Sequence, residues 1–276
     1  MSRQDGPVLI ESRSNPRVRA ALALRERRER DATGRTLVDG ARESLRAIEA
    51  GVEVVDAFVC PALLDSDDGR RALELVDRLP AARRAEVSER AFERLAYGDR
   101  ADGIVLVVST PSTRLEDLRL PEMPLIVVTE DVEKPGNVGA ILRSADAVGA
   151  SAVIAVGGTD LFNPNVIRAS IGTIFRVPLA AGSAAEVIGW LRASGIRMVT
   201  SRVDAAVLHV DANLRGPVAI VLGSEADGLS GVWRSPAIDG VRLPMLGGAD
   251  SLNVSAAAAV LLYEAWRQRR DTAESA

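Results

Sequence analysis

The 276-residue sequence is poor in side chains on which much enzyme chemistry depends. Cys60 and His209 are its one cysteine and its one histidine, which excludes an internal disulfide, a thiolate zinc site and any mechanism with two histidines. Cys60 stands in an apolar run and is expected to be a core residue. The sequence has no P-loop motif, no Gly-x-Gly-x-x-Gly after a strand-like run and no carboxylate cluster with metal-ligand spacing. A P-loop nucleotidase and a standard dinucleotide fold are therefore disfavoured, and no metal is expected.

Long apolar segments are absent as well. No run approaches the roughly 20 residues that a membrane helix needs, and residues 1–17 contain no apolar signal core. Apolar residues make up 47% of the sequence and charged residues 26%, as in a globular protein long enough for two domains. The expectation is a cytoplasmic protein with no membrane partner.

Lysine is nearly absent too. Lys134 stands alone beside 33 arginines, and the formal net charge is −4. The total charge does not indicate a basic nucleic-acid binder, but ten arginines stand against five acidic residues between Arg13 and Arg46. Arginine binds phosphate through its planar fork and stacks on bases. This local excess predicts either an RNA-contacting surface or a solvated Arg/Glu helix face.

The hydrophobic pattern divides the sequence into two α/β halves, 1–108 and 124–276, joined by a proline-containing linker at 109–123. The first half alternates helices and strands. Its helices are expected at 16–30, 41–51, 68–79 and 88–96. Its strands are expected at 36–40, 52–60 and 103–108. The second half has apolar runs that suit parallel strands buried on both faces. These strands are expected at 125–128, 152–156, 196–200 and 218–222. The accompanying helices are expected at 138–149, 184–194 and 251–269.

Three stretches of the second half place polar residues directly after an apolar strand. In the first, a helix begins near Asn137 and Arg143 follows six residues later, so free backbone N–H groups favour an anionic or polar ligand. In the second, Gly223 permits close approach of a ligand, and Glu225 follows in a loop at the edge where open α/β sheets bind ligands. In the third, an irregular loop precedes a helix for which Asp250 or Ser251 is the expected cap. Ordinary turns and helix caps explain each stretch taken alone.

Together the three stretches resemble the motifs of the SpoU/TrmH-type RNA 2′-O-ribose methyltransferases of the SPOUT superfamily. The first family motif matches Asn137, Gly139 and Arg143. The second matches Gly223, Glu225 and Gly228, and the third matches Pro244, Met245 and Ser251 to Ser255. The motifs occur in family order across 124–269. The stretch SRSNPRVR…ARESLRAIEAG resembles, more loosely, the family's N-terminal RNA-binding domain, which is itself similar to a ribosomal protein.

The resemblance implies a fold, an assembly and a cofactor. It implies a C-terminal α/β SPOUT domain with a trefoil knot, preceded by a smaller α/β domain that binds the RNA substrate. It also implies a homodimer whose active site is shared across the interface. S-adenosylmethionine would lie in the knot. The residues implied to hold it are Gly223, Leu243, Met245, Leu252, Thr200 and Ser201.

The same resemblance assigns residue roles. The implied catalytic residues are Arg143, Asn137, Glu225, Ser251 and Asn253. The family's proposed base for the 2′-hydroxyl proton is the arginine at the position of Arg143. A guanidinium rarely gives up its proton, so we expect Arg143 to orient the target phosphate and stabilise the developing alkoxide. The residues expected to contact RNA are Arg17, Arg25, Arg27, Arg28 and Arg168.

The expected activity is S-adenosylmethionine-dependent 2′-O-methylation of rRNA, with 23S rRNA as the first candidate. The additional N-terminal domain, and the close spacing of SLNVS with the terminal YEAWRQR, favour rRNA. A tRNA ribose methyltransferase is the alternative, and an RNA-binding protein that retains the fold without catalysis is a second. A housekeeping role and protection against ribosome-targeting antibiotics both stay open.

Overall fold

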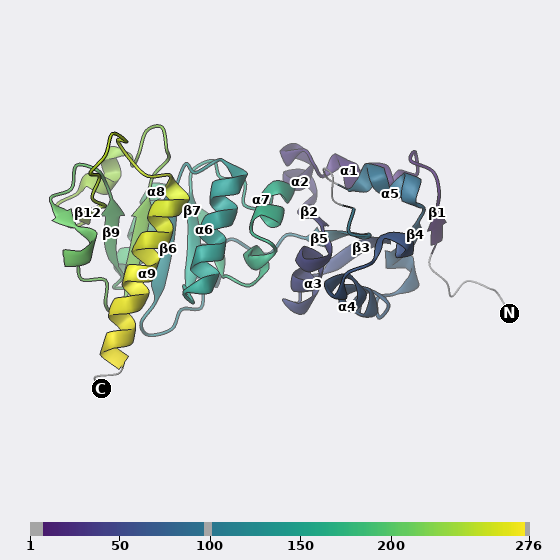
Figure 1. Cartoon of the computed structure of the whole chain (residues 1–276), viewed down its shortest axis with the longest axis horizontal. Helices are drawn as coiled ribbons and strands as arrows, with labels where there is room; N and C mark the ends of the chain where they lie inside the picture. Colours follow the sequence, from purple (N-terminus) through teal and green to yellow (C-terminus); the bar gives the residue numbers. More distant parts are fainter. Residues whose placement is uncertain (1–7, 97–100, 274–276) are drawn as a thin grey trace. The chain divides into compact units, whose positions relative to one another are not determined.

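The computed structural model describes residues 8–96 and 101–273. The chain divides into two compact units (Figure 1). Unit 1 comprises Met1–Pro111 together with Phe162–Arg176, and unit 2 comprises Ser112–Leu161 together with Val177–Ala276. The segment Phe162–Arg176 is therefore part of unit 1, although both of its neighbours in sequence belong to unit 2. The hydrophobic pattern of the sequence does not indicate that this segment leaves unit 2.

Unit 1 is a mixed five-stranded sheet with helices packed on it. The strand order is β1 (Val8–Ile10), β4 (Arg84–Val87), β3 (Val54–Val59), β5 (Ile104–Ser109) and β2 (Arg35–Asp39), and β5 runs antiparallel to both of its neighbours. Its helices are α1 (Pro16–Ala23), α2 (Arg27–Thr33), α3 (Ala41–Glu49), α4 (Asp67–Val76), α5 (Glu89–Leu95) and α7 (Pro164–Ala169). Val18 of α1 and Phe92 of α5 share a buried core with Phe58 of β3 and with Cys60, which is buried as expected.

The first predicted helix is wrong in one respect, because 16–30 forms two helices instead of one. Asn15 caps α1 through a hydrogen bond from the N–H of Arg17, and the helix ends at Ala23. The side chain of Arg30 turns inward and donates to the carbonyls of Leu24 and Arg25 over 2.9 and 2.8 Å. The break is tolerated because this buried guanidinium replaces backbone donors at those carbonyls.

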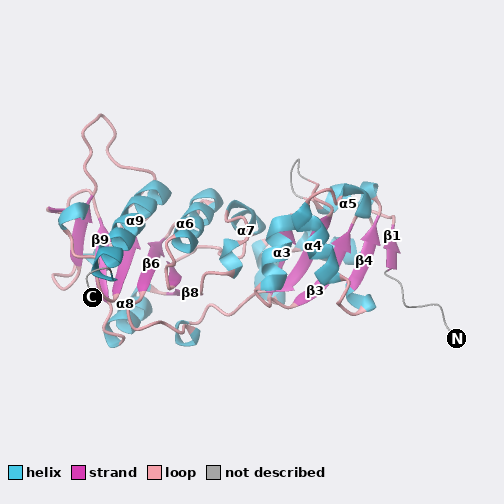
Figure 2. Ribbon diagram, turned by 60° about the horizontal axis from the view of Figure 1, so that its bottom comes forward, coloured by secondary structure: helices cyan, strands magenta, loops and turns pink. Residues whose placement is uncertain are grey.

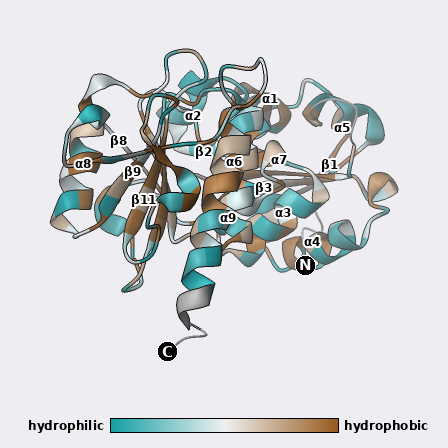
Figure 3. Ribbon diagram, turned by 60° about the vertical axis from the view of Figure 1, so that its left-hand side comes forward, coloured by the Kyte–Doolittle hydropathy of each residue, from teal (hydrophilic) through white to brown (hydrophobic). Residues whose placement is uncertain are grey.

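Unit 2 is a parallel seven-stranded sheet between two helix layers. The strand order is β10 (Val207–Leu208), β12 (Asp239–Arg242), β9 (Arg197–Ser201), β11 (Val218–Leu222), β6 (Leu125–Glu130), β7 (Ala152–Val156) and β8 (Leu179–Gly182). Figure 2 shows α6 (Pro135–Ala147) and α9 (Val254–Ala273) along one face and α8 (Ala184–Ala193) on the other. The adjacent strands β11, β6 and β7 are buried throughout, which explains their uninterrupted apolar runs. In Figure 3 the strands are accordingly among the most hydrophobic elements.

The last helix begins later than predicted. The cap of α9 is Asn253, whose Oδ1 accepts the N–H of Ser255 over 3.0 Å, so neither Asp250 nor Ser251 fills that role. No helix in the described part of the chain is long and apolar enough to cross a membrane. Residues 1–17 are predicted to contain no signal core, and the first seven of them lie outside the described residues.

Candidate active site

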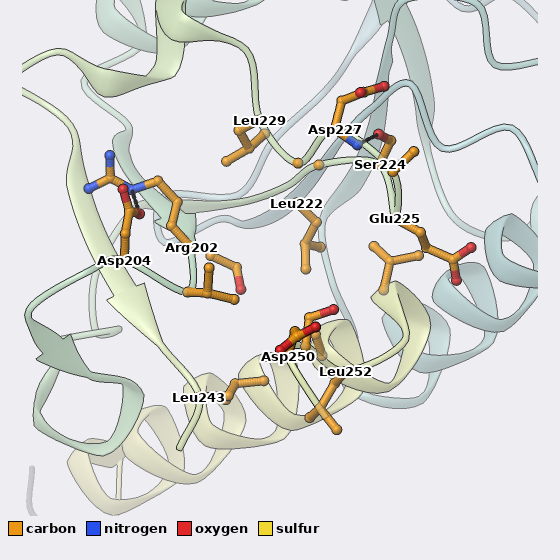
Figure 4. Close-up of a pocket in the computed structure, with 18 of the residues that line it drawn as sticks. Arg202, Asp204, Leu222, Ser224, Glu225, Asp227, Leu229, Leu243, Asp250 and Leu252 are labelled. Atoms are coloured by element: carbon orange, nitrogen blue, oxygen red, sulfur yellow. Dashed lines mark hydrogen bonds and ion pairs between the residues drawn. The ribbon is translucent and has the colours of Figure 1, made fainter. Parts of the chain in front are cut away.

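A cavity of about 440 Å³ opens at the carboxyl ends of the strands of unit 2 (Figure 4). Its walls come from the end of β9, the loop after β11, the loop after β12 and the first turns of α9. The lining includes five of the six residues predicted to hold the cofactor, namely Ser201, Gly223, Leu243, Met245 and Leu252. Such an edge is where parallel sheets place ligands.

One residue from each of the three motifs meets in a hydrogen-bonded network beside this cavity. Asn137, in the first turn of α6, donates from Nδ2 to Oε1 of Glu225 over 2.9 Å. Asn253 donates from Nδ2 to the same oxygen over 2.6 Å and to Oδ1 of Asn137 over 3.1 Å. The hydroxyl of Ser255 in turn holds Oδ1 of Asn253 over 2.6 Å. The carboxylate of Glu225 is thus the shared acceptor of two amides that lie 116 residues apart in sequence.

Lys134, at the residue before α6, completes what we call the Glu225 network. Its ammonium forms an ion pair with Oε2 of Glu225. The hydrogen bond from Lys134, followed by the one from Asn137, holds the pKa of the Glu225 carboxyl below its ordinary value. Glu225 is therefore an ionised, acceptor-only group at neutral pH, with both oxygens engaged.

Two predicted catalytic residues, Arg143 and Ser251, lie outside the Glu225 network, and Thr200, which is predicted to hold the cofactor, does not line the cavity. Arg143 is exposed on α6 and shares no hydrogen bond or ion pair with the network among the described residues. Ser251 lines the cavity and has an exposed side chain. Thr200 is fully buried, and its Oγ1 donates to the carbonyl of Asp239 over 2.9 Å, so it joins β9 to β12.

Two of the arginines expected to contact RNA are turned toward protein partners. Arg17 forms an ion pair with Asp56, with its Nε 3.1 Å from Oδ2. Arg25 donates to the last carbonyls of α5 and the one that follows, at residues 94–96, over 3.0–3.2 Å. These two side chains therefore stabilise the packing of unit 1.

The remaining arginines of that set differ in exposure. Arg27 and Arg28 are exposed on α2, and Arg27 lies 3.6 Å from the exposed carboxylate of Asp31. Arg168 of α7 is half-buried and lies 3.4 Å from Asp39, whose side chain is only 8% exposed. On exposure alone, Arg27 and Arg28 are the better placed for a phosphate.

Several residues of the site are missing from the predicted set. Lys134 had a sequence signal, because it is the one lysine and precedes Asn137 by three residues. Arg202 and Arg234 had no sequence signal, and both line the cavity. There they flank Asp204, with Nε of Arg202 3.7 Å from Oδ1 and Nη1 of Arg234 2.6 Å from Oδ2. Figure 4 shows Arg202 and Asp204 across the cavity from Glu225. Among the described residues, no three His, Cys, Asp or Glu side chains are grouped to hold a metal ion.

The cavity suits a ligand with an apolar ring and polar edges. Leucines 222, 229, 243 and 252 contribute apolar surface, and the loop after β11 contributes backbone. A Cβ on Gly223 would lie 2.2 Å from the carbonyl carbon of Gly228, so a glycine is required where this loop folds back on itself. Gly223 and Gly228 have no side chains, so this loop presents its main chain to the cavity at these two positions.

Comparison with known proteins agrees with this site. The SpoU rRNA Methylase family matches residues 124–263, and the MRM3-like substrate binding domain matches residues 15–106. The 23S rRNA (uridine(2479)-2′-O)-methyltransferase of Streptomyces viridochromogenes is 33% identical, with 89% of this chain and 87% of the relative covered. The crystal structure of an RNA 2′-O ribose methyltransferase is 42% identical with a TM-score of 0.81, covering 95% of this chain and 99% of that one. An AdoMet-bound rRNA methyltransferase from Sinorhizobium meliloti is 29% identical with a TM-score of 0.84, covering 94% and 97%.

These matches show that the parallel sheet, with the cavity at its carboxyl edge and the carboxylate–amide network, is the α/β domain of an RNA methyltransferase. The chain belongs to the SpoU rRNA methylase family. The family and the two-part α/β fold predicted from the motifs are thereby confirmed. The trefoil knot stays a prediction.

Proposed function

We propose that this protein transfers a methyl group from S-adenosylmethionine to a ribose 2′-hydroxyl of 23S rRNA. The observation that carries the proposal is the Glu225 network, in which Asn137, Glu225 and Asn253 meet beside the cavity. Relatives named for 23S rRNA match this chain across both units, which supports rRNA over tRNA. Unit 1 would bind the RNA and unit 2 would carry the reaction. The substrate would place the enzyme with ribosomes in the cytoplasm.

The cavity residues have distinct roles in this proposal. Gly223, Leu243, Met245 and Leu252 would hold the cofactor, which supplies an electrophilic methyl group when bound. The chain itself has to place the ribose oxygen in line for transfer and to stabilise its developing negative charge. The ionised Glu225 holds the amides of Asn137 and Asn253 in fixed orientations from which they can position the ribose.

Arg143 would provide the positive charge. Its exposed guanidinium would act on the target phosphate and the alkoxide as a cation. Among the described residues, Arg143 shares no hydrogen bond or ion pair with the Glu225 network of its own chain. This arrangement is compatible with an active site to which a second copy contributes.

We also propose the homodimer. Helix α9 buries one side in unit 2 through Ala258, Leu261, Leu262 and Ala265. Its other side exposes Val260, Tyr263 and Trp266, which are spaced by three residues, and Met123 is exposed beside Trp266 around a second cavity. An apolar stripe on an otherwise packed helix is typical of an interface. A second copy of this chain would cover it.

The activity is tested by methyl transfer from radiolabelled S-adenosylmethionine to large-subunit rRNA, small-subunit rRNA and bulk tRNA. We expect label in large-subunit rRNA, at a nucleotide whose 3′ phosphodiester resists alkali. Arg143→Ala serves as the inactive control. Label in tRNA alone would support the tRNA alternative. Cofactor binding without label in any RNA or in ribosomal particles would support the non-catalytic one.

The dimer is tested by sedimentation velocity. Trp266→Glu places a charge in the apolar stripe and is expected to yield monomers with little methyl transfer. Val210→Glu changes an equally exposed valine outside the stripe and is the matched control. A Trp266→Glu protein that stays dimeric would contradict this interface.

A further inference from the structure

Glu130 is a buried carboxylate that belongs to none of the three motifs. It is the last residue of β6, in the middle of the seven-stranded sheet, and only 4% of it is exposed. An ionised group at such a position is costly unless its oxygens receive hydrogen bonds. The partners of Glu130 therefore indicate why an acid is accommodated there.

The donors to Glu130 come from one short segment, the turn Ser230–Trp233. Oε2 accepts the N–H of Ser230 over 2.7 Å. Oε1 accepts the hydroxyl of Ser230 and the indole Nε1–H of Trp233, each over 2.8 Å. Trp233 itself is fully buried in the core of unit 2. Three hydrogen bonds from one turn converge on a single side chain, so together they form a firm attachment.

This attachment lies at the end of the loop that forms one wall of the cavity. The loop leaves β11 after Leu222, folds back at Gly228 and reaches Ser230 through Leu229, which lines the cavity. Arg234, the residue after Trp233, also lines it. Glu130 does not line the cavity and holds the wall from behind, so it can affect a ligand only through the shape of the loop.

We propose that Glu130 is a positioning residue for S-adenosylmethionine, which anchors loop 223–229 in the shape that receives the cofactor. The proposal rests on the cofactor site proposed above. A loop held in its binding shape before the ligand arrives loses less conformational entropy on binding. Loss of the anchor should therefore weaken cofactor affinity more than it slows transfer from the saturated enzyme.

The neighbouring residue provides a matched control. Asp131 is also an acid at the end of β6, and its Oδ1 accepts the N–H of Gly158 over 3.3 Å. Gly158 belongs to the loop after β7 and does not line the cavity. The backbone of Asp131 has φ 51°, a conformation that asparagine tolerates, so Asp131→Asn and Glu130→Gln each replace an acid by its amide without backbone strain.

The experiment measures S-adenosylhomocysteine binding by calorimetry, together with Tm and the kinetics of methyl transfer. Glu130→Gln is expected to raise the Kd, and the KM for S-adenosylmethionine, about tenfold, with kcat within about twofold of the unsubstituted protein. Asp131→Asn is expected to leave the Kd unchanged. Trp233→Phe removes one of the three hydrogen bonds and keeps an aromatic ring, so a smaller rise of about threefold is expected.

Three outcomes decide the proposal. An unchanged Kd in Glu130→Gln, or an equal rise in Asp131→Asn, would overturn the anchoring role and leave the proposed function intact. An unsubstituted protein that does not bind S-adenosylhomocysteine would overturn both. If Glu130→Gln does not fold, Trp233→Phe decides the matter, because an unchanged Kd there contradicts the anchor.

Discussion

The two units use their charged and polar side chains in different ways. In unit 1 several arginines bind other parts of the protein. Arg17 forms an ion pair with Asp56, Arg25 donates to backbone carbonyls, and Arg30 is buried. In unit 2 the polar side chains gather where strands end, and Glu225 is the centre of one such group. A count of arginines therefore overstates the surface of unit 1 that is available to RNA, whereas the motif residues of unit 2 do meet at a site.

Two carboxyl groups show the same contrast. Burial, followed by the charge of Asp102, raises the pKa of Glu43 in unit 1. The hydrogen bonds from Lys134 and Asn137 lower the pKa of Glu225 in unit 2. Desolvation decides the first direction and donated hydrogen bonds decide the second. The surroundings of Glu225 thus favour an ionised acid, whereas the surroundings of Glu43 disfavour the ionised form.

The largest effect is expected at Arg143. Arg143→Lys keeps one positive charge but loses the planar fork, so methyl transfer should fall by roughly 10²–10³-fold at every pH. The measurement is the pH–rate profile with large-subunit rRNA. Near-normal activity with a lowered apparent pKa would contradict the cationic role and favour the arginine as base.

A smaller effect on catalysis is expected at Lys134. Its loss in Lys134→Met should raise the pKa of Glu225, so the decline of activity on the acid side should begin at a higher pH. At the acid limb the rate should fall roughly fivefold, since the ion pair is largely exposed, and it should recover as the pH rises. Lys134→Arg keeps the charge and is expected to restore the profile. An acid limb that does not move in Lys134→Met would remove Lys134 from the network's function.

The arginines of unit 1 are expected to separate into two classes. Replacement of Arg27 and Arg28 by alanine should weaken RNA binding and reduce the slope of log affinity against log salt by about one to two, without a change in Tm. Arg25→Met should instead lower the free energy of unfolding by about 1–3 kcal/mol, because three carbonyls lose a donor. Filter binding over a salt series measures the RNA affinity, and thermal unfolding measures the stability. If Arg25→Met weakened RNA binding as much as the Arg27 and Arg28 replacement does, the proposed division into two classes would be wrong.

The smallest effect is expected at Glu43. Because its folded-state pKa is raised, the stability present below the ordinary glutamate pKa of 4.5 is lost as the pH rises through the raised value. Glu43→Gln cannot ionise, so its Tm should exceed that of the unsubstituted protein by roughly 2 °C at neutral pH and should match it in acid. Thermal unfolding at pH 4 and pH 7 checks both parts. A lower Tm at pH 7 would show that the carboxylate is needed.

Much of the fold follows from local patterns, and the exceptions have a common cause. The strands β6, β7 and β11 are uninterrupted apolar runs because both of their faces are covered. The pattern misses β1, β4, β8, β10 and β12, which are two to four residues long and include partly or fully exposed positions. Burial, rather than strand formation, is what the hydrophobic pattern records.

The candidate site divides in the same way. The structure brings together Asn137, Glu225 and Asn253, one residue from each motif, because each stands where a parallel strand or its following loop reaches one edge of the sheet. Lys134 joins them across 91 residues of sequence. No motif points to Glu130, whose partner Trp233 lies 103 residues away.

By itself the sequence determined the local hydrophobic periods and the residue types at the ends of the strands. Helices and strands repeat every few residues, so their hydrophobic periods can be predicted from the sequence without a structure. Tertiary structure alone decided which distant side chains meet. The strand order that places β11 beside β6 brings Trp233 to Glu130 and Glu225 to Lys134, and the assignment of Phe162–Arg176 to unit 1 is of the same kind. Such contacts depend on packing between segments far apart in the chain, which no local pattern encodes.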